Sequence, residues 1–156
     1  MTARLLGIAR KGRPRGAVET IERAEIGLAA GVAGDFRGAL KPGGRRQVTA
    51  IAWADWRAAM DALGHPPIAW SDRRVNLLID GALPCETGAR LRVGGALLEI
   101  TGECDPCSRM EEVWPGLKAA LTPDGRGGRT MRVIEGGAIA IGDLVLLVTE
   151  DDREAV

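Results

Sequence analysis

The chain has 156 residues, of which 46% are hydrophobic and 27% are charged, a balance typical of one soluble globular domain. No apolar stretch approaches the roughly 18 residues that a membrane-spanning helix needs. Its three cysteines are too few, and odd in number, for a disulfide framework. These features argue against a disulfide-stapled secreted protein and against a membrane partner, and we expect a cytoplasmic protein with free thiols.

The net charge is zero, but the two signs are unevenly distributed. Residues 1–50 contain ten Lys and Arg against four Asp and Glu, whereas residues 134–156 contain six acidic residues and one Arg. The basic excess fits an anionic ligand such as a phosphate group, although a solvated basic face would have the same composition. Neutral total charge and only five aromatic residues argue against a nucleic-acid partner.

Short apolar segments separated by glycine and proline predict many short strands. Gly94–Gly95 is expected to turn one hairpin, and Gly142–Asp143 is expected to turn a second that opens at Gly136–Gly137. In chain order, the predicted strands are Leu5–Ala9, Gln47–Trp53, Val75–Asp80, Arg90–Val93, Leu97–Thr101, Met131–Ile134 and Leu144–Thr149.

Two helices are expected between these strands. The first has one apolar face, made of Trp56, Ala59, Met60 and Leu63. It should end at Gly64. The second should begin with Asp105 as N-cap and Pro106 at the first helical position, and Pro115 should divide it. The expected fold is therefore mainly β, most simply a β-barrel with two or three short helices.

The stretch TGECDPCSRMEE holds two of the three cysteines, Cys104 and Cys107. A helix that begins at Pro106 would place Cys107 in its first turn, where unpaired N–H groups favour a thiolate. Asp105 and the glutamates that follow would oppose this charge. The pattern thus indicates Cys107 as a candidate nucleophile or metal ligand.

Other interpretations of the cysteines stay open. A zinc site would need Cys85, Cys104, Cys107 and the single histidine, His65, which is far away in the sequence. A thioredoxin-like pair would need a βαβ pattern, which is absent here. Cys104 also fits a small buried hydrophobic residue, and Cys85 fits an ordinary loop position.

Several stretches occur in a familiar order: GVAGDFRG, RRQVTAIAW, RRVNLLIDG, TGARLRVGGALLEITGECDPCSRM, GRGG and VIEGGAIAIGDLV. With these, the chain resembles stand-alone MOSC domains, a family named after the C-terminal domain of molybdenum cofactor sulfurases. The resemblance extends over about 5–148, within a single domain of 1–156 whose residues 149–156 form an acidic tail. It implies a MOSC-type β-barrel and either binding of the pterin-based molybdenum cofactor or sulfur transfer.

The resemblance also implies site residues. It places a metal-ligating, catalytic cysteine at Cys107 and cofactor-binding residues at Arg74 and Asn76. An arginine suits a phosphate, an amide suits a polar ring edge, and a thiolate suits a soft metal centre. Arg45 and Arg46 are further candidates for neutralising the phosphate. Arg129, in a Gly-rich basic loop, is a candidate for closing over the ligand.

Three functions remain open at this point. The first is a molybdenum oxidoreductase that reduces N-hydroxylated compounds with electrons from a separate protein. The second is a sulfurtransferase in which a Cys107 persulfide serves the maturation of a metal–sulfur centre, with a sulfur-donor protein as partner. The third is a cofactor carrier without turnover. No bound pyridoxal phosphate is expected, because the only lysines, Lys11, Lys41 and Lys118, lie in no recognisable Schiff-base context.

Overall fold

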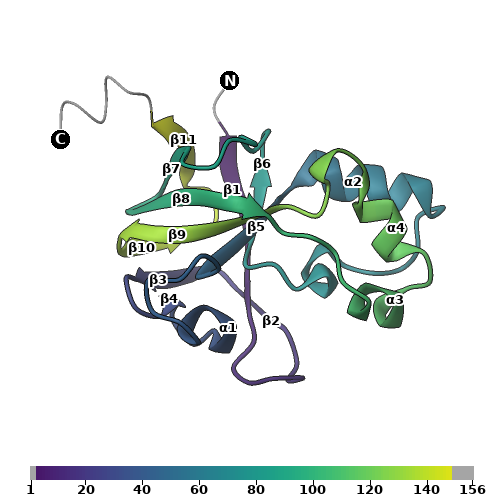
Figure 1. The fold of residues 1–156 in the computed structure, drawn as a ribbon, viewed down its shortest axis with the longest axis horizontal. Helices are drawn as coiled ribbons and strands as arrows, with labels where there is room; N and C mark the ends of the chain where they lie inside the picture. Colours follow the sequence, from purple (N-terminus) through teal and green to yellow (C-terminus); the bar gives the residue numbers. More distant parts are fainter. Residues whose placement is uncertain (1–2, 149–156) are drawn as a thin grey trace.

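Seven strands close into a barrel because the last strand of the described residues pairs with the first (Figure 1). The computed structural model describes residues 3–148. Around the barrel the order is β11 (Leu144–Val148), β7 (Arg90–Val93), β8 (Ala96–Glu103), β9 (Arg129–Glu135), β5 (Val48–Ala52), β6 (Leu77–Asp80) and β1 (Ala3–Arg10). Strand β2 (Glu19–Ile21) extends this sheet beside β1. The mainly β, barrel-type fold expected from the sequence is thereby confirmed.

A second, smaller sheet consists of β10 (Gly137–Ala140), β3 (Arg23–Gly27) and β4 (Gly31–Val32). This sheet corrects one prediction. Gly142–Asp143 does form a turn, in which the Asp143 N–H donates to the Ala140 carbonyl at 3.0 Å. However, β10 pairs with β3, whereas β11 pairs with β7 and β1. The two strands beside the turn thus belong to different sheets and form no hairpin.

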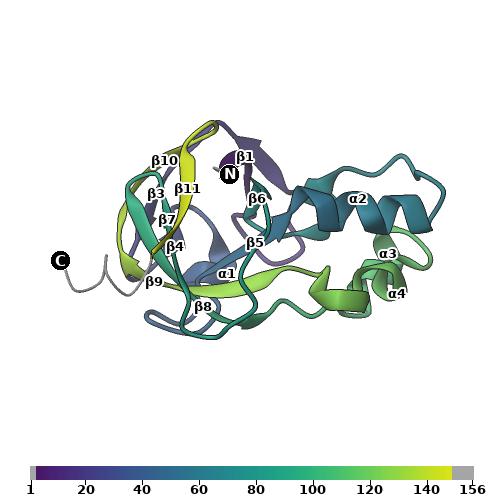
Figure 2. The same cartoon turned by 90° about the horizontal axis from the view of Figure 1, so that it is seen from above.

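The helices lie mostly on one side of the barrel (Figure 2). Within residues 3–148 there are four α-helices: α1 (Phe36–Ala39), α2 (Trp53–Ala62), α3 (Arg109–Val113) and α4 (Leu117–Leu121). Two 3-10 turns, η1 (Trp70–Arg73) and η2 (Pro123–Gly125), complete the set. As expected, α2 ends just before Gly64 and Pro115 separates α3 from α4; α1 was not predicted.

Strand β5 is buried along its whole length because it separates two hydrophobic cores. Val48, Ala50 and Ala52 face the barrel interior, whereas Ile51 packs with Trp56 among the helices. This arrangement attaches the helical layer rigidly to the barrel. No helix among residues 3–148 has the length and apolar character that crossing a bilayer requires.

Candidate functional site

A pocket with a cavity volume of about 60 Å³ lies where β1, α1, η1 and the segment before α3 meet. We call it the cationic pocket, because seven basic residues line it: Arg10, Lys11, Arg37, Arg46, Arg73, Arg74 and Arg109. Cys107 lines the same pocket, and Asp35 is the one acidic residue in its lining. Such a concentration of positive charge favours an anionic ligand.

Asp35 builds one wall of the pocket through its buried carboxylate. Its Oδ1 accepts from the Lys11 N–H at 3.0 Å, and its Oδ2 accepts from the Gly38 N–H at 3.1 Å, as an N-cap of α1. The Phe36 N–H donates to the Lys11 carbonyl at 2.8 Å. These bonds hold Lys11 and Arg37 on the same wall, and both cations lie within 6 Å of the Phe36 ring centroid, at 5.7 and 5.8 Å.

The basic side chains of the pocket disfavour one another's charge. Burial, followed by repulsion from Arg74, Arg109 and Arg37, lowers the pKa of Lys11 below its ordinary value. Burial and repulsion from Arg46 and Arg109 likewise lower the pKa of Arg37. An anion in the pocket would relieve this repulsion, so the electrostatics of the wall favour a negatively charged occupant.

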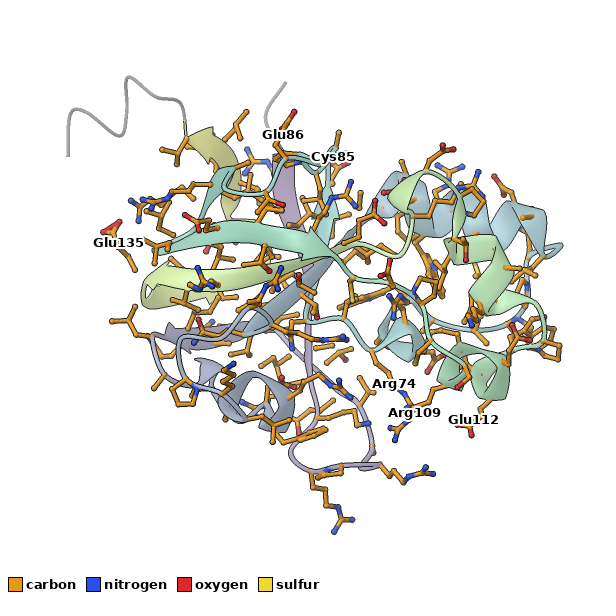
Figure 3. All side chains as sticks on the ribbon, in the orientation of Figure 1. Arg74, Cys85, Glu86, Arg109, Glu112 and Glu135 are labelled. Carbon is orange, nitrogen blue, oxygen red and sulfur yellow. The ribbon has the colours of Figure 1, made fainter. Side chains whose placement is uncertain are left out.

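Arg74 reaches the pocket through an unusual backbone conformation. It follows η1 with φ 68° and ψ 33°, the left-handed region that a non-glycine residue seldom adopts, and its N–H donates to the Ser71 carbonyl at 3.0 Å. Figure 3 shows Arg74 and Arg109 on the same side of the molecule, far from Cys85. Such strain is found preferentially at functional sites.

Cys107 is exposed, and the backbone around it differs from the prediction. Helix α3 begins at Arg109 after Ser108, not at Pro106, so Asp105 is not its N-cap and Cys107 lies outside the helix. The positive charge near the thiol comes from the arginines of the pocket and not from a first helical turn. Cys104, by contrast, is 1% exposed and belongs to the helical core, which confirms its expected burial.

The sequence-derived candidates are only partly brought together. Arg46, Arg74 and Asn76 line the cationic pocket with Cys107, whereas Arg45 does not. Arg45 is exposed, and its carbonyl accepts from the Thr101 hydroxyl.

Arg129, expected from the sequence to close over a ligand, also lies outside the pocket lining. It is buried because its guanidinium donates to the carbonyls of Pro84 at 2.9 Å and of Gly125 and Gly128 at 3.0 Å, and lies 3.1 Å from Cys85 Sγ. These contacts tie the loop before β9 to the Cys85 loop. Arg129 therefore has a structural role in this fold.

Asn76 lines the pocket, but its side chain is bound to the protein. Its Oδ1 accepts from the Thr49 N–H at 3.0 Å, and its Nδ2 donates to the Ala9 carbonyl at 3.1 Å. These bonds connect β5, β1 and the chain just before β6. Asn76 thus shapes the pocket wall, and one N–H of its amide is left for any further partner.

A protein-only metal centre has no support in the residues that the structure describes. Across 3–148 there is no group of three or more His, Cys, Asp and Glu side chains that could hold a metal ion. His65 lies 3.4 Å from Asp61 on the exposed side of α2. The zinc interpretation of the three cysteines and His65 is therefore wrong.

Sequence reasoning singled out none of Lys11, Arg37 and Arg73 as a site residue. The basic bias of residues 1–50 was the available signal, because Lys11, Arg37 and Arg46 all fall within it. Nothing local in the sequence shows that these three segments meet the chain around Cys107.

Comparisons with known proteins agree with this architecture. The family model of the MOSC domain matches residues 33–146. YuaD from Bacillus subtilis has a similar structure, with a TM-score of 0.74 and 20% sequence identity over 93% of this chain and 94% of that one.

YiiM from Geobacillus stearothermophilus gives a TM-score of 0.70 and 19% identity over 94% of this chain and 75% of that one. YiiM from Escherichia coli gives a TM-score of 0.69 and 15% identity over 94% of this chain and 70% of that one. No curated protein matches the chain in sequence. At these identities the structural likeness shows the fold alone. The family model covers most of the chain, and the chain therefore belongs to the MOSC domain family.

Proposed function

We propose that this MOSC-domain protein binds a molybdenum cofactor at the cationic pocket and reduces N-hydroxylated compounds with electrons from a partner protein. The observation that carries the proposal is the meeting of an exposed cysteine, Cys107, with seven basic side chains in one pocket. A thiolate suits a soft metal, and the cations suit a phosphate.

The residues present fit the two charged ends of such a cofactor. Its phosphate would be held by the basic wall of Lys11, Arg37 and Arg46, and its metal by Cys107. The cavity volume of about 60 Å³ is well below the roughly 300–1,000 Å³ of typical ligand pockets, so the pocket does not enclose a whole pterin. A partner protein that covers the pocket mouth would supply the missing enclosure.

The protein's own contribution is binding and orientation. When bound, the molybdenum centre would supply oxygen-atom abstraction from the substrate. Arg74 and Arg109 line the pocket with Cys107 and would attract anionic groups to it. Asn76 and Asp35 hold the walls through buried hydrogen bonds.

Metal analysis of protein expressed in a molybdenum-replete host tests the proposal. We expect stoichiometric molybdenum in the wild type and in Cys85→Ser, and its loss in Cys107→Ser. Arg46→Met should lower the molybdenum content by about fivefold, whereas Arg45→Met, the neighbouring arginine outside the pocket, should leave it unchanged. A wild type that contains no molybdenum would contradict cofactor binding through Cys107, and so would a Cys107→Ser variant that contains as much molybdenum as the wild type.

A second candidate function is sulfur transfer, favoured by the exposure of Cys107. An exposed thiol can meet a sulfur-donor protein and carry a persulfide without a permanent cofactor. Cyanide-labile sulfur on metal-free protein, absent from Cys107→Ser, would support this alternative. A carrier without turnover would instead load molybdenum and show no reductase activity with a chemical electron donor.

A further inference from the structure

Arg73 is a buried guanidinium that joins three segments beside the cationic pocket. Its Nη2 donates to the Cys104 carbonyl at 2.7 Å and to the Gly127 carbonyl at 2.9 Å, and it lies 3.4 Å from Cys104 Sγ. Its Nη1 lies 3.8 Å from Met110 Sδ. One side chain of η1 thus binds the segment before α3, the start of α3 and the loop before β9.

The positive charge of Arg73 has no negative partner. The residue is 3% exposed, and its hydrogen-bond partners among the described residues are carbonyls and sulfur atoms. Among residues 3–148 no ion pair involves Arg73, and its buried Nε has no hydrogen-bond partner. Burying an unpaired charge is unfavourable for folding. Arg73, unlike the equally buried Arg129, places this charge in the lining of the cationic pocket.

The contacts of Arg73 and its buried charge both concern the segment that carries Cys107. The residues that Arg73 contacts in this segment, Cys104 and Met110, stand on either side of Cys107, and the Met110 N–H donates to the Cys107 carbonyl at 3.0 Å. Arg73 and Cys107 line the same pocket. The side chain therefore fastens both ends of the stretch that carries the thiol, and its buried positive charge belongs to the lining of the pocket that Cys107 also lines.

We propose that Arg73 is a positioning residue for Cys107, which keeps the thiol at the cationic pocket and makes it selective for anionic reaction partners. This role deepens the proposed function and rests on it only in naming Cys107 as the reacting residue. The charge acts through a poorly solvated region, where electrostatic interactions are screened less than in water.

Alkylation of Cys107 in metal-free protein tests the role without any cofactor. The rate with iodoacetate, an anion, is divided by the rate with iodoacetamide, its neutral analogue, at one pH. Both rates depend on the fraction of Cys107 present as thiolate, so their ratio does not. The ratio therefore reports the electrostatic potential at the thiol. Peptide mass spectrometry assigns the product to Cys107, since exposed Cys85 also reacts.

Arg73→Met should lower the ratio by about threefold or more, whereas Arg73→Lys, which keeps the charge, should retain it. Both variants lose the two-carbonyl fork. In Arg73→Lys, which keeps the charge, the rate with neutral iodoacetamide should rise about twofold as the segment is released and the thiol becomes more accessible. Arg57→Met, on the exposed face of α2, is the matched control and should change neither quantity.

An unchanged ratio in folded Arg73→Met would overturn the proposal. So would an equal fall in Arg73→Lys, because the charge would then not be what the reagent senses. If Arg73→Met does not fold, Arg73→Lys still decides: a rate with iodoacetamide that stays at the wild-type value would show that the two-carbonyl fork does not position Cys107, and would overturn the role. Failure of molybdenum binding alone would leave all these outcomes in place.

Discussion

Thr49 and Asn76 are bonded to each other reciprocally at the boundary between the barrel and the cationic pocket. Asn76 Oδ1 accepts from the Thr49 N–H at 3.0 Å and from Thr49 Oγ1 at 3.2 Å, while the Asn76 N–H donates to Thr49 Oγ1 at 3.1 Å. Both residues are buried. The pair holds β5 against the chain that enters β6 and so fixes the wall from which Arg74 reaches the pocket.

Asn76→Ala should lower the free energy of unfolding by about 2–3 kcal/mol, because it leaves the buried Thr49 N–H without a partner. Urea denaturation measures the loss, and Thr20→Ala, on the exposed edge strand β2, serves as a control with little effect. Wild-type stability in Asn76→Ala combined with loss of molybdenum would instead support the direct ligand role that the family resemblance implies.

Gly127→Ala should destabilise the protein by about 2 kcal/mol, the cost of overpacking at a site closed on several sides. A Cβ at this position would collide with the Cys104 carbonyl and would lie 3.1 Å from Pro106 Cδ and 3.3 Å from Arg73 Nη2. Thermal unfolding measures the change. Gly27→Ala is the matched control, because no atom lies within 4 Å of its added Cβ; equal stability of the two variants would contradict the tight packing around Arg73.

Lys11 should make the stability of the metal-free protein increase with pH on the alkaline side of neutrality. Because the pKa of Lys11 is lowered in the folded state, the unfolded chain binds more protons between that pKa and the ordinary value of 10.5. The free energy of unfolding therefore rises with pH across this window, as the repulsion from Arg74, Arg109 and Arg37 is removed.

Urea denaturation of wild type and Lys11→Met from about pH 7 to about pH 10 measures this contribution. The difference in stability, wild type minus variant, should increase with pH. Added inorganic phosphate should reduce the dependence, because an anion in the pocket favours charged Lys11. A difference that is constant or decreases with pH would show that Lys11 is not disfavoured as a cation.

Local sequence signals were sufficient where an element depends on its own residues. The Gly94–Gly95 hairpin forms as predicted, with Val93 opposite Ala96, because a tight turn between alternating strands sets its own register. Helix α2 buries Trp56, Ala59 and Met60, the face that the helical spacing indicated. The predicted acidic tail, 149–156, and Thr149 of the last predicted strand lie outside the described residues.

Predictions failed where a neighbour distant in sequence decides. Residues 136–148 resemble a hairpin, yet β10 pairs with β3 and β11 closes the barrel against β1, two partners that lie more than 100 residues away in the sequence. Helix α3 starts after Cys107 because the chain from Cys104 is bonded to Arg73 and Gly128 instead of turning at Asp105.

The sequence by itself determined the class of fold, the apolar face of α2 and the importance of the stretch around Cys107, since periodicity, turn residues and the cysteines are local properties of the chain. Only the tertiary structure decided which basic residues meet that thiol. Lys11, Arg37, Arg46 and Arg73 come from four separate segments, and Arg45 and Arg129 are turned elsewhere. Barrel closure and the packing of η1 against α3 bring these charges together, and no spacing along the chain encodes the distances between them.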